Sequence, residues 1–186
     1  SYGEEITVMP RNFPLSFRHG GGTDRHYAII GMAHVADGYP MFYDAVNEKG
    51  LGMAGLNFAA SARYSEPEDG KQNVAQLEFI PWVLSQFASL GQARSAIEKI
   101  NLVGTTYDSR YPAAKMHWII ADKSGAITVE PTEGGLKIYD NAPGVLTNEP
   151  PFDMQLFNLN NYMRLSPKQP ENSFSDALDL GTYSRG

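Results

Sequence analysis

YDAVNEKGLGMAGLNF, residues Tyr43–Phe58, contains two apolar runs on either side of the polar tetrapeptide NEKG. Asn, Gly and their polar neighbours favour tight turns, so the two runs are predicted to pair as a β-hairpin. The second run is rich in small residues, yet it has a side-chain amide, Asn57, near its end. The place of that amide raises the question of what it binds.

Two interpretations of Asn57 follow from the residues around it. Alternate residues of a strand share a face, so Met53, Gly55 and Asn57 are predicted to lie together. A glycine beside an amide leaves space for a ligand, and an Asn side chain can donate to the oxyanion of an acyl transfer. A plain local hydrogen bond is the alternative, and residue statistics favour it. Asn148, in GVLTNEPPF, poses the same choice between an active role and a cap or turn.

Composition limits the classes of protein. The chain has 186 residues, a net charge of −6 and 42% hydrophobic residues, which is typical of one globular domain over residues 1–186. Nothing in it resembles the basic footprint of a nucleic-acid-binding protein, and no apolar run is long enough for a membrane span. There is no cysteine, which excludes disulfides, thiolate metal sites and a thiol nucleophile within these residues.

Hydrophobic periodicity predicts strands, then two helices, then strands again. This order is typical of α+β domains with mainly antiparallel pairing. The predicted strands are at 4–9, 27–33, 41–46, 51–58, 116–121, 126–130 and 136–139, with a short extended stretch at 144–147. The predicted helices are at 77–87, 90–100 and 152–163, and loops are expected at 61–73 and 101–115.

Other candidate groups give weaker signals. Ser1 could act as an N-terminal nucleophile, but no partner for its amine is evident nearby. The four histidines form no close metal-binding pair, and His117 is expected to be a paired structural residue in a strand. Glu48, in the hairpin turn, is expected to be a solvated carboxylate. Aromatic residues near the hairpin suit either core packing or an apolar ligand pocket.

Several segments are more specific than these periodicities. They are VMPRNF (8–13), DGYPMFYDAVNEKGLGMAGLNF (37–58), FIPWVL (79–84), MHWIIAD (116–122), ITVEPTEGGLKIYDN (127–141), GVLTNEPPFD (144–153) and LFNLNNY (156–162). In this order, they resemble the choloylglycine hydrolase family, which comprises conjugated bile salt hydrolases and penicillin V acylases. The resemblance covers essentially the whole chain. It implies the N-terminal-nucleophile (Ntn) hydrolase fold, a four-layer αββα sandwich, here as a partial chain incomplete at both ends.

The resemblance also implies an activity. The family hydrolyses the amide bond of glycine- or taurine-conjugated bile acids with an N-terminal cysteine, whose α-amine moves the proton. Because this chain has no cysteine, the nucleophile is expected outside these residues. Ser1 then matches an interior position, and Arg185 is not equated with the family's late Arg. Two alternatives remain, a penicillin V acylase and a non-catalytic truncated relative that binds bile salts.

Family site residues can be matched to positions of this sequence. Asn57 resembles the Asn of the oxyanion hole, and Asn148 the Asn that supports the tetrahedral intermediate. Penicillin V acylases often have Tyr where Asn57 stands, so Asn57 favours bile salts. The apolar substrate pocket is expected to hold a steroid by buried area, with few hydrogen bonds. Its residues in this chain would be Ala36, Tyr43, Tyr107, Tyr111 and Met116.

Assembly and location also come from the resemblance. The family is usually a homotetramer, and Pro167–Gly186 resembles its assembly loop. No metal and no organic cofactor is implied, and neither nucleic acid nor a membrane is an expected partner. With no signal peptide visible, we expect the cytoplasm of a Gram-positive bacterium.

Overall fold

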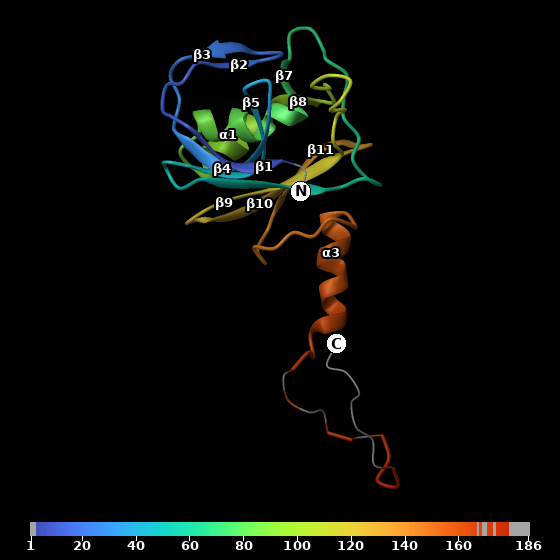
Figure 1. The fold of residues 1–186 in the computed structure, drawn as a ribbon. Helices are drawn as coiled ribbons and strands as arrows, with labels where there is room; N and C mark the ends of the chain where they lie inside the picture. The colour runs from blue at the N-terminus through green and yellow to red at the C-terminus, as the bar shows by residue number, and fades with distance from the viewer. Residues whose placement is uncertain (1–2, 167, 169–170, 173, 179–186) are drawn as a thin grey trace. The chain divides into compact units, whose positions relative to one another are not determined.

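The computed structural model describes residues 3–166, 168, 171–172 and 174–178 (Figure 1). The chain forms two compact units that divide after Phe152. A single domain over the whole chain therefore stays a prediction. Ser1, which the sequence raised as a candidate nucleophile, and Arg185, which we did not equate with the family's late Arg, lie outside the described residues. So does most of the expected assembly loop.

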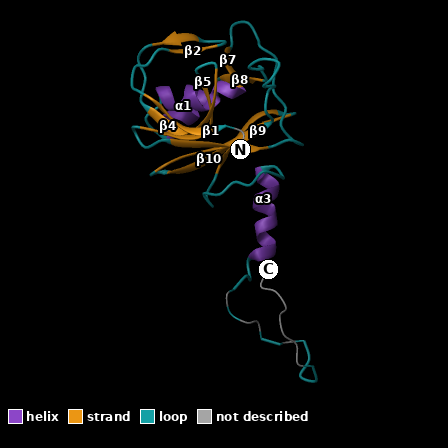
Figure 2. Ribbon diagram, viewed as in Figure 1, coloured by secondary structure: helices purple, strands orange, loops and turns teal. Residues whose placement is uncertain are grey.

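A seven-stranded sheet forms the centre of the first unit, and all its neighbouring strands are antiparallel (Figure 2). The α+β class with mainly antiparallel pairing is thus confirmed. The order of strands is β1-β4-β5-β6-β9-β10-β11. Their bounds are β1 Glu4–Met9, β4 Ile29–Ala36, β5 Tyr39–Asn47, β6 Gly52–Asn57, β9 Met116–Asp122, β10 Gly125–Thr132 and β11 Gly135–Asp140.

The predicted hairpin is the junction of β5 and β6. Gly50, in its turn, has φ 84°, a backbone conformation that glycine adopts without strain. Asn47 is buried and uses both ends of its amide. Its Nδ2 donates to the carbonyls of Leu84 and Phe87, each at 2.8 Å. Its Oδ1 accepts the backbone N–H groups of Lys49 and Leu51, so one side chain joins the turn to a helix end.

Two helices cover one face of this sheet. Helix α1, Phe79–Gln86, packs on β5 and β6, and seven of its eight residues are buried, as expected for a helix that is apolar on most sides. The 3-10 turn η1, Gln76–Glu78, precedes it, so the helix begins at Phe79, two residues later than the predicted start at residue 77. Helix α2, Leu90–Ile97, is capped at its start by Ser89, whose hydroxyl accepts the Gln92 N–H at 3.4 Å.

The structure corrects several connections. The predicted second helix ends at Ile97, because Ile100–Val103 forms strand β8, which pairs in parallel with β7, Gln72–Ala75. Residues 72–73 of β7 and 101–103 of β8 lie in segments that we expected to be loops, and Ile100 lies in the segment that we expected to be helical. A further small hairpin joins β2, Leu15–Phe17, to β3, Gly21–Thr23. The stretch 144–147 is not a strand, because the Asn141 side chain holds its first residues in a turn.

Apolar residues divide unequally between the two faces of the large sheet. The helix-covered face has the core, with Met53, Trp118 and Ile120 packed against α1 and α2. On the opposite face Val8, Ile30 and Val46 are paired partners across β1, β4 and β5, yet 40–61% of each is exposed. The first unit therefore leaves an apolar sheet face uncovered.

The second unit begins with the body of helix α3, Phe152–Asn158, followed by the 3-10 turn η2, Leu159–Tyr162. Of the four residues whose spacing predicted burial, only Phe152 is buried. Leu156 is half-buried, while Leu159 is 50% and Met163 82% exposed. No helix in the described part of the chain is long and apolar enough to cross a membrane.

Candidate active site

Asn57 is the last residue of β6, and its side chain is exposed. Its partner in the pairing of β6 with β9 is Met116. Within the described residues, the Asn57 amide has no hydrogen-bond partner. The structure therefore does not show the local hydrogen bond that was the alternative interpretation of Asn57. The next residue, Phe58, is fully buried and stacks on His117 with ring centroids 4.2 Å apart. The strand end is thus anchored while the amide stays accessible.

Gly55 does not leave the free space that the sequence suggested. A Cβ at this position would lie 3.0 Å from Met116 Cε and 3.1 Å from Trp118 Nε1. The glycine instead lets two large side chains of β9 pack against the backbone of β6. The open volume lies further along, where Met116 lines a cavity.

That cavity measures about 380 Å³, within the range of small-molecule sites. It brings together four of the five residues predicted to bind substrate, and its lining is mainly apolar. Ala36 does not line the cavity, but its carbonyl accepts the Tyr107 hydroxyl at 2.9 Å. The predicted lining residues are Tyr43, Tyr107, Tyr111 and Met116. The other apolar lining residues are Met41, Phe42, Leu77, Ile80, Pro112, Ala114 and Trp118.

Polar contacts fix the two loop tyrosines of this wall. The Tyr111 hydroxyl and His34 Nε2 form a hydrogen bond of 2.9 Å. The Arg18 guanidinium lies over the Tyr107 ring, 4.9 Å from its centroid. Arg110 lies over the Tyr111 ring at 5.3 Å. Sequence reasoning missed His34 and Arg18, since no local pattern links them to a loop more than 70 residues away. It also missed Arg110, although this residue directly precedes Tyr111 in the loop itself.

Arg110 is itself held by acidic partners. Its guanidinium makes ion pairs with Asp37 at 2.7 Å and with Asp108 at 2.5 Å. The hydrogen bond from Arg110 lowers the pKa of the Asp108 carboxyl. The loop that presents Tyr107 and Tyr111 is therefore cross-linked to the β4–β5 turn, which keeps both rings at the cavity.

A buried carboxylate lies behind the same wall. Glu78 is 2% exposed and accepts the Arg18 backbone N–H with both oxygens, at 3.1 and 3.0 Å. Burial raises the pKa of Glu78 despite these contacts. Burial also raises the pKa of the Tyr39 hydroxyl nearby, and the Glu78 charge adds to that shift. This network supports Arg18, which in turn contacts Tyr107.

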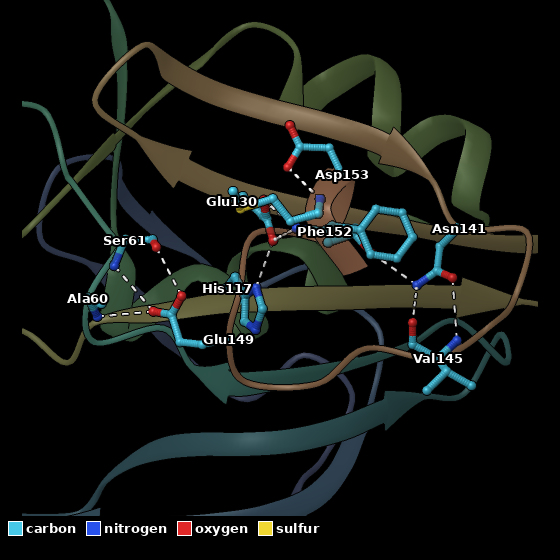
Figure 3. Close-up of polar contacts among 11 residues, drawn as sticks. Ala60, Ser61, His117, Glu130, Asn141, Val145, Glu149, Phe152 and Asp153 are labelled. Carbon is cyan, nitrogen blue, oxygen red and sulfur yellow. Dashed lines mark hydrogen bonds and ion pairs between the residues drawn. The ribbon is translucent and has the colours of Figure 1, made fainter. Parts of the chain in front are cut away.

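Asn148 lies in the loop between β11 and α3, and its side chain is exposed. The structure gives its amide no hydrogen-bond partner in the part of the chain that it describes. Glu149, the next residue, accepts the backbone N–H groups of Ala60 and Ser61 at 3.0 and 3.2 Å (Figure 3). The loop with Asn148 is therefore joined to the turn that follows Asn57.

His117 and Glu130 form a buried pair beneath this loop. Both side chains are fully buried, and His117 Nδ1 lies 2.9 Å from Glu130 Oε1 (Figure 3). Glu130 also accepts the Phe152 backbone N–H at 3.0 Å. The expectation that His117 is a paired structural residue is confirmed.

The candidate elements of a site are thus an apolar cavity and two exposed side-chain amides, Asn57 and Asn148. An amide N–H pair can stabilise negative charge on a carbonyl oxygen. Among the described residues, no cluster of three or more His, Cys, Asp or Glu side chains could hold a metal ion.

Comparison with solved structures defines the class of protein. The fold matches a crystal structure of a variant of conjugated bile acid hydrolase from Clostridium perfringens, with a TM-score of 0.88 and 38% identity. The match covers 100% of this chain and 58% of that one. Penicillin V acylase from Agrobacterium tumefaciens shares the fold at 22% identity and a TM-score of 0.72, over 89% of this chain and 50% of that one. The fold is that of amide hydrolases of this type.

Residues 1–186 match the family described as linear amide C-N hydrolases, choloylglycine hydrolase family. The chain belongs to the choloylglycine hydrolase family. It is 50% identical to a bile salt hydrolase/transferase of Lactiplantibacillus plantarum over its whole length. That alignment covers 57% of the relative, so this chain spans little more than half of it.

Proposed function

We propose that the complete protein hydrolyses the amide bond of glycine- or taurine-conjugated bile acids. The observation that supports this most is the pairing of Asn57, an exposed amide, with Met116, a residue that lines the apolar cavity. A conjugated bile acid has the matching layout, a large apolar body next to one amide bond. Identity of 50% to a bile salt hydrolase/transferase adds to the argument.

The chemistry assigns separate roles to this chain and to the rest of the protein. The α-amine of a cysteine outside these residues takes the proton of its own thiol as the sulfur attacks the amide carbonyl, and it then gives that proton to the leaving nitrogen. The Asn57 amide donates to the oxygen as it becomes negative, and Asn148 supports the same tetrahedral intermediate. The C–N bond then breaks and glycine or taurine leaves with the proton. Water hydrolyses the thioester and releases the bile acid.

The cavity supplies binding for the apolar body. Tyr43, Tyr107, Tyr111 and Met116 present apolar surface, and burial of such surface is worth about 25 cal/mol per Å². Ala36 acts indirectly by holding the Tyr107 hydroxyl. Asn57 favours bile salts over penicillin V, following the family pattern at that position.

The proposal includes the architecture of the complete protein. Its apolar sheet face, with Ile6, Val8, Ile30 and Val46 exposed, suits a second sheet as the partner layer of a four-layer αββα sandwich. We also propose that the complete protein is a homotetramer in the cytoplasm of a bacterium. Relatives in Lactiplantibacillus plantarum and Clostridium perfringens support the bacterial origin.

The test is amino-acid release by the complete protein, offered glycocholate, taurocholate and penicillin V side by side. Release of glycine or taurine, abolished by thiol alkylation, is the expected result. Faster hydrolysis of penicillin V would favour the acylase alternative. Folded protein that binds bile salts but releases no amino acid would favour the non-catalytic alternative.

A further inference from the structure

The carboxylate of Glu149 connects two loops that are far apart in the sequence. Glu149 Oε1 accepts the backbone N–H groups of Ala60 at 3.0 Å and Ser61 at 3.2 Å. Glu149 Oε2 accepts the Ser61 hydroxyl at 2.9 Å. Figure 3 shows both oxygens directed at this turn. Three donors therefore converge on one carboxylate, and hydrogen bonds to an ionised acceptor are stronger than neutral ones.

The loop that contains Glu149 is anchored at its two ends by buried polar groups. At its start the Asn141 amide, 2% exposed, donates to Thr128 Oγ1 and to the Val145 carbonyl, both at 3.0 Å. At its end Glu130 accepts the Phe152 N–H. These contacts attach the loop to β10. Glu149 alone among these anchoring side chains reaches the turn after β6.

The two proposed amides lie at the ends of this link. Asn148 directly precedes Glu149, and Asn57 lies three residues before Ala60. Phe58, between Asn57 and the turn, is locked by its stack on His117. The hydrogen bonds between Glu149 and the Ala60–Ser61 turn therefore connect the loop of Asn148 to the strand end of Asn57.

We propose that Glu149 is a positioning residue, which holds Asn57 and Asn148 at the separation that the tetrahedral intermediate requires. This inference rests on the proposed function of the two amides. Catalytic groups need placement within a fraction of an ångström, and a misplacement of about 1 Å can cost on the order of 100-fold in rate. Glu149 acts through the backbone of its own loop and of the Ala60–Ser61 turn, without touching the substrate.

The test compares Glu149→Ala, Glu149→Gln and Ser61→Ala in the complete protein, with glycocholate as substrate. Glu149→Ala is expected to lower kcat about 10- to 100-fold with KM nearly unchanged, because the cavity is intact. Glu149→Gln keeps an acceptor for the two N–H groups and is expected to restore most of kcat. Ser61→Ala loses one donor of three and should have a smaller effect. Glu133→Gln, in the exposed β10–β11 turn, is the matched control.

Hydrogen–deuterium exchange gives a second readout that needs no activity. In Glu149→Ala, exchange is expected to rise in peptides that contain 58–62 and 144–149, with β9 and β10 unchanged. Wild-type kcat in Glu149→Ala, together with an inactive Asn57→Ala variant, would overturn this inference and leave the proposed function standing. Unchanged exchange in both loops would also overturn it. A wild-type protein that hydrolyses no conjugate would overturn both proposals.

Discussion

Asn57 and Met116 are direct partners across β6 and β9, so the exposed amide pairs with one residue that lines the cavity. Under the proposed function, the substrate's amide bond lies at Asn57 and its apolar body lies in the cavity beyond Met116. The contribution of the amide and that of the cavity can therefore be measured separately. Removing the amide should affect the reacting carbonyl, whereas removing a cavity residue should affect capture.

The first prediction concerns Asn57→Ala in the complete protein. Turnover of glycocholate is expected to fall about 100- to 1,000-fold, the usual cost of one oxyanion donor. The midpoint of thermal unfolding should barely move, because the side chain is exposed and has no hydrogen bond within the described residues. Steady-state kinetics and a thermal melt measure both. Asn160→Ala, another exposed amide, is the control, and wild-type turnover in Asn57→Ala would rule out the oxyanion role.

The second prediction concerns the cavity. Tyr107→Ala is expected to raise KM for glycocholate about 10- to 100-fold, since burying an aromatic side chain is worth about 1.5–3 kcal/mol. Turnover at saturation should change little, because the reacting atoms are untouched. Tyr107→Phe loses only the hydrogen bond to the Ala36 carbonyl, so its KM should lie between the KM of wild type and that of Tyr107→Ala. A large fall in kcat at unchanged KM would contradict the pocket assignment.

The sequence was informative where local chemistry decides the structure. The NEKG turn and the alternation around it predicted the β5–β6 hairpin, and with it the place of Asn57 at a strand end. It failed for β7 and β8, because their parallel pairing joins Asn73 to Asn101 and gives neither segment a local signal. It also misjudged Gly55, because the side chains that fill the space come from β9.

In the candidate site, too, some features could be predicted from the sequence and others depend on distant contacts. Family resemblance assigned the cavity residues, and the structure brings four of them together. The contacts that hold the site were not predictable, because their partners are far apart in the sequence. His34 bonds to Tyr111 of the cavity wall, and Glu149 bonds to Ser61 in the turn after Asn57, only once the fold has formed. Glu48 is a further example. It is exposed, as expected, but it also accepts the Ala28 N–H at 3.0 Å and pairs with Arg11, which the sequence did not predict.

The third prediction concerns stability. Asn47→Ala is expected to lower the free energy of unfolding by about 2–4 kcal/mol, because it removes four hydrogen bonds and leaves buried groups unpaired. Denaturant titration measures the change, with Asn160→Ala as the control. A loss below about 0.5 kcal/mol would mean that solvent replaces those bonds and that Asn47 does not secure the turn.

The fourth prediction is a pH dependence at Glu48. The Arg11 hydrogen bond, aided by the Ala28 N–H, lowers the pKa of the Glu48 carboxyl from 4.5 to about 2. A carboxyl with a depressed folded-state pKa stabilises the fold above its unfolded pKa and loses that contribution as pH falls. Glu48→Gln should therefore be less stable than wild type at pH 6, and the difference should shrink between pH 4.5 and 2. Denaturant titrations across this range measure it, with Glu133→Gln, a carboxyl in the exposed β10–β11 turn, measured in parallel as the control. A Glu48→Gln difference that stays constant from pH 6 to pH 2 would refute the ionic contribution of Arg11 and leave only a neutral hydrogen bond.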